Sequence, residues 1–185
     1  SLIAIFTTIS SRFLWFTLDD GYITLRYSKH LANGNGLVWN IMSNNPVEGY
    51  TSFLWVLIGA VPHIFGLPAV TFVKVVGALA TVASMIILYL YGRRRGLNRV
   101  FLAIGCAQLG VSPAVAVLSI QGMETTTAML LILIASIGAL ELAQTYSRRW
   151  AAVMNVSLLL GMLSRPDLVI YAIILEASIA GVLYY

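Results

Sequence analysis

The stretch FTLDDGYITLRYSKHLANGNGLVWN (Phe16–Asn40) interrupts an otherwise apolar chain. It places two adjacent acids, Asp19 and Asp20, directly after an apolar segment that runs from Leu2 to Leu18, and long apolar runs follow it. Two like charges side by side are costly near hydrocarbon. The acid pair therefore marks a point where the chain leaves an apolar environment, and it raises the question of what two carboxylates do there.

The composition is that of an integral membrane protein. Of the 185 residues, 59% are hydrophobic and 10% are charged, whereas soluble domains carry about 25% charged residues. The formal net charge of +4 comes from a few basic residues clustered between apolar runs, which indicates topology signals and not a nucleic-acid surface. The single cysteine, Cys106, excludes a disulfide within the chain.

The apolar runs predict an all-α, polytopic membrane protein. A helix needs about 20 apolar residues to cross a bilayer. Because the chain starts with Ser and ends inside an apolar stretch, we expect it to be the N-terminal part of a larger protein. The expected spans cover residues 2–18, 67–91, 100–120, 125–146, 150–164 and 168–185.

Two basic clusters set the expected orientation. Arg93–Arg95 with Arg99 form one cluster, and Arg148 with Arg149 form the other. Two spans separate the clusters, so both lie on one side, which the positive-inside rule makes cytoplasmic. If residues 51–67 also spanned, the acid pair would share that side.

We expect residues 51–66 to lie along the membrane surface, because Pro62 and His63 suit a short juxtamembrane helix better than a lipid-exposed span. Residues 22–32 should form a second juxtamembrane helix with Tyr27 on its apolar face, ended by the NGNG sequence at 33–36. The first loop then lies outside, on the side of the membrane opposite the arginines. Five acids share this outer side: Asp19, Asp20, Glu48, Glu124 and Asp167.

The acid pair admits two interpretations. Aspartate caps helices well, and a helix is expected to start at about Gly21–Tyr22. One aspartate suffices for a cap, however, and two adjacent acids suit general-base catalysis, metal ligation or both. Spacing alone leaves the two interpretations open.

The other polar candidates also have structural alternatives. Glu48 belongs to a polar turn before an aromatic belt that includes Tyr50, and Glu124 complements a helix N-terminus. Arg165 and Asp167 form a local ion pair at a span end, or Arg165 binds phosphate, which a guanidinium suits geometrically. His30 and His63 are too few for a metal site.

Two further features of the sequence bear on these candidate residues. The span 150–164 is about 22 Å long at 1.5 Å per residue, short of a hydrocarbon core of about 30 Å, so Arg165 should lie slightly below the outer surface. The sequence contains no Walker loop, dinucleotide-binding glycine motif, HExxH or GxSxG. Soluble-nucleotide chemistry is therefore unsupported.

Taken in order, LDDGYITLRYSKHLANGNGLVWN, PVEGYTSFLW, GMET and SRPD resemble the N-terminal half of GT-C type, polyprenyl-phosphate-dependent glycosyltransferases. The resemblance is closest to the AftB-like cell-wall arabinofuranosyltransferases of actinobacteria and covers Leu18 to Asp167. Gly21, Ser52 and Leu168 depart from the residues common in that family. None of the departures removes a carboxylate, so they bear on sugar identity and not on activity.

The resemblance implies a GT-C bundle whose outer first loop carries two juxtamembrane helices, in the plasma membrane with the active site on the extracytoplasmic face. It implies sugar transfer from a polyprenyl-phosphate donor to a glycan or glycolipid acceptor, with inversion. Asp19 or Asp20 is the expected base, and either or both are expected to hold a divalent cation, Mg or Mn. The expected substrate-binding residues are Arg26, Lys29, Glu48, Tyr50, Glu124, Arg165 and Asp167.

Two other functions remain open from the sequence. A transporter or flippase of lipid-linked saccharides would need acids near mid-span, where the sequence offers Glu176. A non-catalytic membrane assembly subunit would tolerate loss of the acid pair.

Overall fold

A computed structural model describes residues 2–11, 16–42 and 47–184. Within these ranges the chain forms helices and no strand, which confirms the all-α prediction. The helices are α1 (Leu2–Ser11), α2 (Asp19–Ala32), α3 (Phe53–Ile64), α4 (Ala69–Arg94), α5 (Arg99–Val111), α6 (Pro113–Ile120), α7 (Thr125–Thr145), α8 (Arg148–Ser164) and α9 (Leu168–Tyr184).

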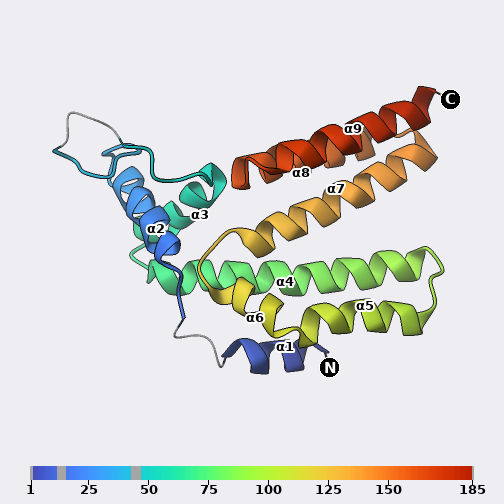
Figure 1. Ribbon diagram of the computed structural model, residues 1–185, viewed down its shortest axis with the longest axis horizontal. Coiled ribbons are helices and arrows are strands. Elements are labelled where there is room, and N and C mark those ends of the chain that lie inside the picture. The colour runs from blue at the N-terminus through green and yellow to red at the C-terminus, as the bar shows by residue number, and fades with distance from the viewer. Residues whose placement is uncertain (1, 12–15, 43–46, 185) are drawn as a thin grey trace.

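The helices form an elongated bundle in which α4, α7, α8 and α9 run side by side (Figure 1). On the other side of α4 lie α5, α6 and α1. Among the described residues, α4 and α7 are long and apolar enough to cross a membrane, and α5 with α6 makes a third candidate if this pair, bent by 56°, is one span. The chain is therefore membrane-associated through two or three such elements.

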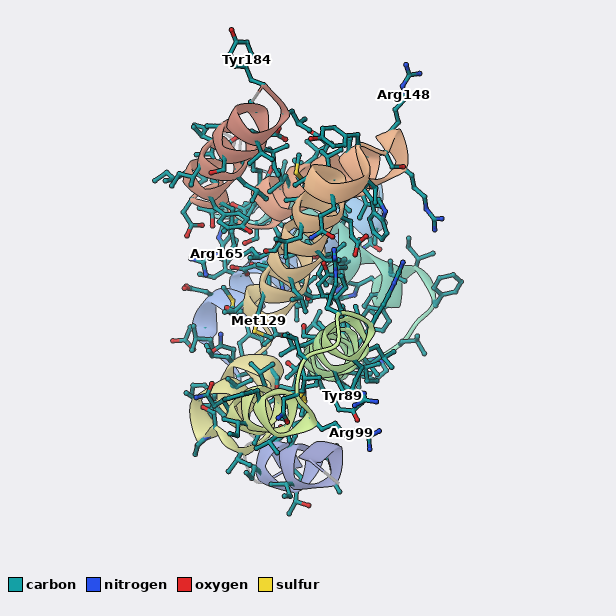
Figure 2. All side chains as sticks on the ribbon, turned by 90° about the vertical axis from the view of Figure 1, so that its right-hand side faces the viewer. Tyr89, Arg99, Met129, Arg148, Arg165 and Tyr184 are labelled. Carbon is teal, nitrogen blue, oxygen red and sulfur yellow. The ribbon has the colours of Figure 1, made fainter. Side chains whose placement is uncertain are left out.

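Apart from the break at Ser112 between α5 and α6, the described connections between helices gather at two opposite ends of the bundle (Figure 1). One end carries α2, α3 and the turns at 121–124 and 165–167, and the other carries the turns at 95–98 and 146–147. We call these the acidic end and the basic end. Figure 2 looks onto the basic end and shows the Arg99 and Arg148 side chains extending outward from it. Since α3 starts and ends at the acidic end, residues 53–64 do not carry the chain across the bundle.

Two helix boundaries near the acid pair differ from those expected. Helix α1 ends at Ser11 and residues 16–18 are not helical, while residues 12–15 of the expected first span lie outside the described residues. Helix α2 begins at Asp19, so the expected start at Gly21–Tyr22 is wrong. Negative charge is favourable in the first turn of a helix, and both aspartates are part of that turn, with Leu18 at the N-cap.

The expected single span at 100–120 is two helices, because a proline follows Ser112. The residue before a proline is driven into extended geometry, and Ser112 has φ −67° and ψ 117°. Its hydroxyl accepts a hydrogen bond from the Val115 amide and so caps α6. The same effect ends α8 at Arg165, which precedes Pro166 and has φ −143° and ψ 110°.

Two glycines allow the bundle to pack closely. A Cβ atom on Gly138 of α7 would lie 2.9 Å from the backbone nitrogen of Met154 in α8. A Cβ atom on Gly77 of α4 would overlap the carbonyl oxygen of Ser119 in α6, and the Gly77 carbonyl accepts a hydrogen bond from Thr126 at 3.0 Å. Helix α4 therefore contacts both α6 and α7 through backbone atoms at one position.

We expect Gly77→Ala to destabilise the protein, because the added methyl group meets a backbone oxygen that cannot move aside. Overpacking of this kind costs about 1–3 kcal/mol. Gly105→Ala is the matched control, since a Cβ atom there would have its nearest neighbour 3.9 Å away and alanine is otherwise favoured in helices by about 1 kcal/mol. Thermal unfolding in detergent should place Gly77→Ala below the wild type and Gly105→Ala at or above it; the reverse order would contradict this packing.

Candidate functional site

The turn between α6 and α7 holds the acidic end together. The Leu18 amide donates a hydrogen bond of 3.0 Å to the Gln121 carbonyl, and the indole Nε1 of Trp55 donates one of 2.9 Å to the Gly122 carbonyl. Gly122 has φ +88°, a conformation that L-residues with side chains rarely adopt. One turn therefore binds the first loop and α3.

The acid pair lies directly on this turn. Leu18, which is bonded to Gln121, immediately precedes Asp19, and a Cβ atom on Gly21 would be 3.3 Å from the Gly122 carbonyl oxygen. Both aspartate side chains are exposed. Successive residues of a helix point about 100° apart, so Asp19 and Asp20 face different directions. One of them can face a substrate group that the other does not reach.

Glu124 and Arg165 bring the turn of α6–α7 together with the turn of α8–α9. Glu124 is 5% exposed, and its Oε1 lies 4.0 Å from Nη1 of Arg165. Arg165 also donates two hydrogen bonds of 3.1 Å to the carboxylate of Asp167. The hydrogen bonds and charge of Asp167, followed by the charge of Glu124, raise the pKa of Arg165. Arg165 thus keeps a fixed positive charge between two acids.

Three buried oxygens near this ion pair have no hydrogen-bond partner among the described residues: Glu124 Oε2, Thr127 Oγ1 and Ser164 Oγ. Helices α7 and α8 are antiparallel neighbours with Gly138 against Met154. Thr127 lies eleven residues before Gly138, and Ser164 lies ten residues after Met154, so the two are at the same level of the bundle. Buried polar atoms without partners are uncommon and costly. Their gathering beside Arg165 indicates a place for a polar ligand.

The loop after α2 is built around Tyr27, whose side chain is fully buried. Its hydroxyl donates to the Val47 carbonyl at 2.5 Å and accepts from the Gly49 amide at 2.9 Å. Its ring meets Tyr50 edge-on, with centroids 4.9 Å apart. Burial, then the charge of Glu48 and the neighbouring Tyr27, raise the pKa of Tyr50. Tyr27 therefore anchors the segment that carries Glu48, which is itself exposed.

Arg26 is occupied within the first loop. Its guanidinium lies 4.2 Å from the centre of the Trp39 ring, and it donates to the Trp39 carbonyl at 3.0 Å and to Asn40 Oδ1 at 2.9 Å. These contacts account for Arg26 structurally, by joining α2 to the residues after NGNG. Arg26 and Lys29 are both exposed.

The two histidines also contribute to loop packing. His30 Nδ1 lies 2.6 Å from the Val38 carbonyl. Burial, followed by the charge of Lys29, lowers the pKa of His63. Within the described ranges, no three His, Cys, Asp or Glu side chains gather as metal ligands, and the divalent cation stays a prediction.

Several residues of this arrangement do not emerge from the sequence. Trp55, Thr127 and Ser164 belong to apolar or common helical sequence, and nothing in their spacing distinguishes them. Glu141 is a second acid inside an expected span besides Glu176; it is 5% exposed and pairs with Arg95 at 2.7 Å. This pair lies at the basic end, so one arginine of the expected topology signal also joins α4 to α7.

Comparison of the chain with protein-family models, with curated proteins and with solved structures finds no match.

We expect Trp55→Phe to weaken the acidic end, because it leaves the Gly122 carbonyl without its indole donor. Loss of a buried hydrogen bond lowers the free energy of unfolding by about 1 kcal/mol, and by up to about 3 kcal/mol if no water molecule replaces the lost donor. Trp150→Phe is the comparison, since the Trp150 indole has no hydrogen bond with any described residue; its side chain is half-buried, and Arg149 lies over its ring. Thermal unfolding in detergent should rank Trp55→Phe as the less stable variant; equal stability would contradict the role of this bond.

We expect Arg165→Gln to raise the pKa of Asp167, because hydrogen bonds and charge from Arg165 hold that pKa below its ordinary value. A carboxyl whose pKa is lower in the folded state stabilises the fold above its unfolded-state pKa, and this stabilisation disappears as pH falls through the folded-state pKa. NMR titration of labelled aspartate measures the shift directly. Arg26→Gln is the control and should leave the pKa of Asp167 unchanged. If Arg165→Gln also left this pKa unchanged, the ion pair between Arg165 and Asp167 would be absent in solution.

Proposed function

We propose that this chain is the acid-bearing part of a membrane glycosyltransferase of GT-C type, which transfers a sugar from a polyprenyl phosphate to a glycan of the cell envelope. The proposal is supported above all by one observation. The exposed pair Asp19–Asp20 is seated on the same turn that leads into Glu124, and Glu124 is ion-paired with Arg165. Two exposed carboxylates, buried oxygens without partners among the described residues and a cationic guanidinium thus occur at one end of a membrane bundle.

The reaction requires a base for the acceptor. One aspartate removes the proton of the acceptor hydroxyl, and the acceptor oxygen attacks the anomeric carbon of the donor. The bond from that carbon to the lipid phosphate breaks, the phosphate leaves with the electron pair, and the anomeric configuration inverts. Because Asp19 and Asp20 point in different directions, we assign proton removal to one and orientation of the acceptor to the other, with Asp19 as the preferred base.

The remaining groups act on the donor. Arg165 provides a permanent positive charge for the phosphate, since guanidinium matches phosphate geometry and stays protonated. Glu124, Thr127 and Ser164 provide buried oxygens that can bind sugar hydroxyls. Glu48 and Tyr50 border the first loop, where the acceptor enters, and exposed Lys29 adds positive charge there. A divalent cation would be held by one aspartate together with phosphate oxygens, the usual mode for Mg²⁺, and would supply charge neutralisation.

The position of the site suits a donor anchored in lipid. Turns at the end of a membrane bundle lie at the height where a polyprenyl chain presents its phosphate and sugar. With the basic end in the cytoplasm, the acidic end faces the extracytoplasmic side of the plasma membrane. A soluble donor would not need the carboxylates at this height.

We expect Asp19→Asn and Asp20→Asn, made separately in the full-length protein, each to reduce sugar transfer strongly, and the variant that removes the base by about 10²–10⁴-fold. The measurement is transfer from a polyprenyl-phosphate sugar to a glycan acceptor in reconstituted membranes. Asparagine has nearly the same shape, so insertion and thermal stability should be retained.

Glu176→Gln is the control for this experiment, because Glu176 lies in α9, away from the acid pair in sequence, and has no role in the proposed reaction. Full transfer activity in both aspartate variants would remove the catalytic assignment. If Glu176→Gln instead abolished saccharide movement across the membrane, the protein would be a transporter.

A further inference from the structure

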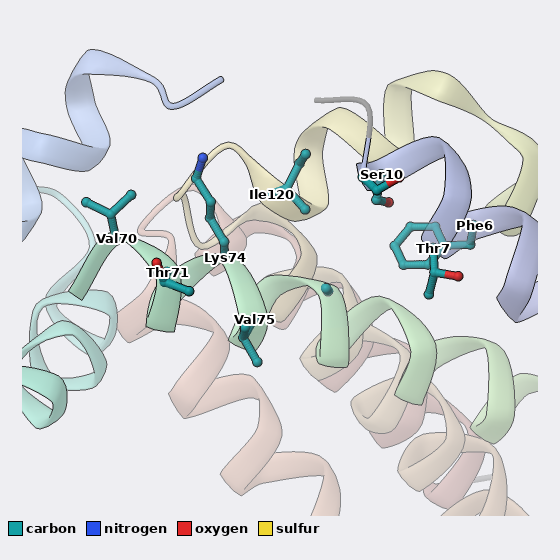
Figure 3. Close-up of a pocket in the computed structure, with 10 residues that line it drawn as sticks. Phe6, Thr7, Ser10, Val70, Thr71, Lys74, Val75 and Ile120 are labelled. Atoms are coloured by element: carbon teal, nitrogen blue, oxygen red, sulfur yellow. The ribbon is translucent and has the colours of Figure 1, made fainter. Parts of the chain in front are cut away.

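A cavity of about 420 Å³ lies between α1, α4 and α6 (Figure 3). Its lining includes one ionisable residue among those described, Lys74, whose Nζ donates a hydrogen bond of 2.7 Å to the Phe16 carbonyl. Figure 3 shows the Lys74 amine and the Ser10 side chain in separate parts of the cavity. These groups do not meet a common ligand, so the cavity gives no indication of what it binds.

A second cavity, of about 500 Å³, lies between α8 and α9 on the other side of α4 (Figure 1). Two polar side chains line it together, Asn155 of α8 and Glu176 of α9. The rest of its lining is apolar and includes Val156 and Leu159. Asn155 is exposed and Glu176 is half-buried, so both groups are open to whatever lies against this face of the bundle.

Asn155 and Glu176 lie near the middle of the bundle. Asn155 follows Met154, whose backbone nitrogen would lie 2.9 Å from a Cβ atom on Gly138. Gly138 is three residues from the centre of α7, about 5 Å along the helix, and Glu176 is the ninth of the 17 residues of α9. Helix α7 is long and apolar enough to cross a membrane. When it does, both polar side chains lie at the level of the hydrocarbon core.

Both side chains have unused hydrogen-bonding groups. The Asn155 amide donates one hydrogen bond, of 3.0 Å, to the Ala151 carbonyl, which leaves one N–H group and the Oδ1 atom. The Glu176 carboxyl has no hydrogen bond or ion pair with any described residue. Lipid chains offer neither donors nor acceptors, and polar groups at this depth are therefore paired within protein or face water. A protein surface that carries both a donor and an acceptor fits here.

The two groups are complementary to a second copy of the same face. Asn155 lies eleven residues before Pro166 and Glu176 ten residues after it, so they are at the same level of two helices joined by a short turn. A twofold axis parallel to the helices keeps every residue at its level and places α8 of one copy opposite α9 of the other. The free N–H group of Asn155 then meets the carboxyl group of Glu176 in the other copy, and the reverse pair forms as well.

The surface around this pair is shaped for a neighbouring helix. Val156 and Leu159 are large apolar residues with about half of their surface exposed. A further cavity of about 320 Å³ lies beside Ala152 and Val156, and hollows the same helix. Apolar side chains of a second copy can fill these two cavities, since helices in membranes associate through close packing together with hydrogen bonds.

We infer that α8 and α9 form the interface of a homodimer in the membrane, with two Asn155–Glu176 hydrogen bonds between the copies at its centre. Asn155 is ten residues from Arg165, about 15 Å along the helix, so the interface leaves the acidic end free. The dimer does not depend on sugar transfer and remains if the proposed function fails.

The test is resonance energy transfer between donor-labelled and acceptor-labelled full-length protein in liposomes, over a range of protein-to-lipid ratios. The wild type should dimerise. Asn155→Leu and Glu176→Leu should each raise the dissociation constant of the dimer about tenfold, the effect of two lost interhelical hydrogen bonds. Ser178→Leu is the control and should leave this constant unchanged, because Ser178 is exposed and lies about 200° around α9 from Glu176.

A mixture of the two variants tests the pairing itself. Dimers of either variant alone have no intact Asn155–Glu176 pair, whereas a mixed dimer keeps one. Energy transfer between the two variants should therefore exceed the transfer within either variant, and a variant that failed to fold would not be rescued in this way. The inference is overturned if the wild type stays monomeric at every ratio, if the single variants dimerise like the wild type, or if the mixed variants associate no better than each alone.

Discussion

The arrangement of the acidic end depends on two backbone carbonyl groups, those of Gln121 and Gly122. A turn after a helix normally exposes its carbonyls to water or leaves them unpaired. Here the Leu18 amide and the Trp55 indole donate to them, and so connect the first loop and α3 to the α6–α7 turn. The left-handed φ of Gly122 aims the second carbonyl at α3, a conformation that a side chain would strain. Among the described residues, no hydrogen bond or ion pair of the Asp19 or Asp20 side chain fixes the acids, and their position is set by this turn.

The sequence predicted the features that follow from composition and charge. A chain with 59% hydrophobic residues has to form helices if it enters a bilayer, because backbone groups there must pair internally. The Arg165–Asp167 pair also followed from local spacing, since Pro166 breaks the helix between them. In each case a single local constraint determined the outcome.

The features that the sequence did not predict depend on contacts between distant segments. The acid pair was expected to cap a helix that starts at Gly21–Tyr22, but Leu18, which is held by Gln121, is the N-cap residue. The helix therefore starts earlier, at Asp19, with both acids in its first turn. Residues 100–120 read as one span because their apolar content is continuous, and only the pair Ser112–Pro113 marks the 56° bend. Thr127 and Ser164 lie at the same level of the bundle only because of the register between α7 and α8. No periodicity in the sequence of either helix reveals this register.

The bend at Pro113 and the glycine at position 77 together determine where the turn lies. A straight helix from Arg99 to Ile120 would continue along α4, whereas the bend lets α6 cross close to it. The absence of a side chain on Gly77 allows the Ser119 carbonyl to touch α4, and Gln121 and Gly122 follow within three residues. Thr126, on the other side of the turn, is bonded to the same glycine. Both ends of the turn thus contact α4 at Gly77. The position of Glu124 along the bundle, and that of the residues that contact the turn, is therefore set by contacts with the α4 backbone. In a closely packed interior, a backbone contact shifts less than a contact between side chains.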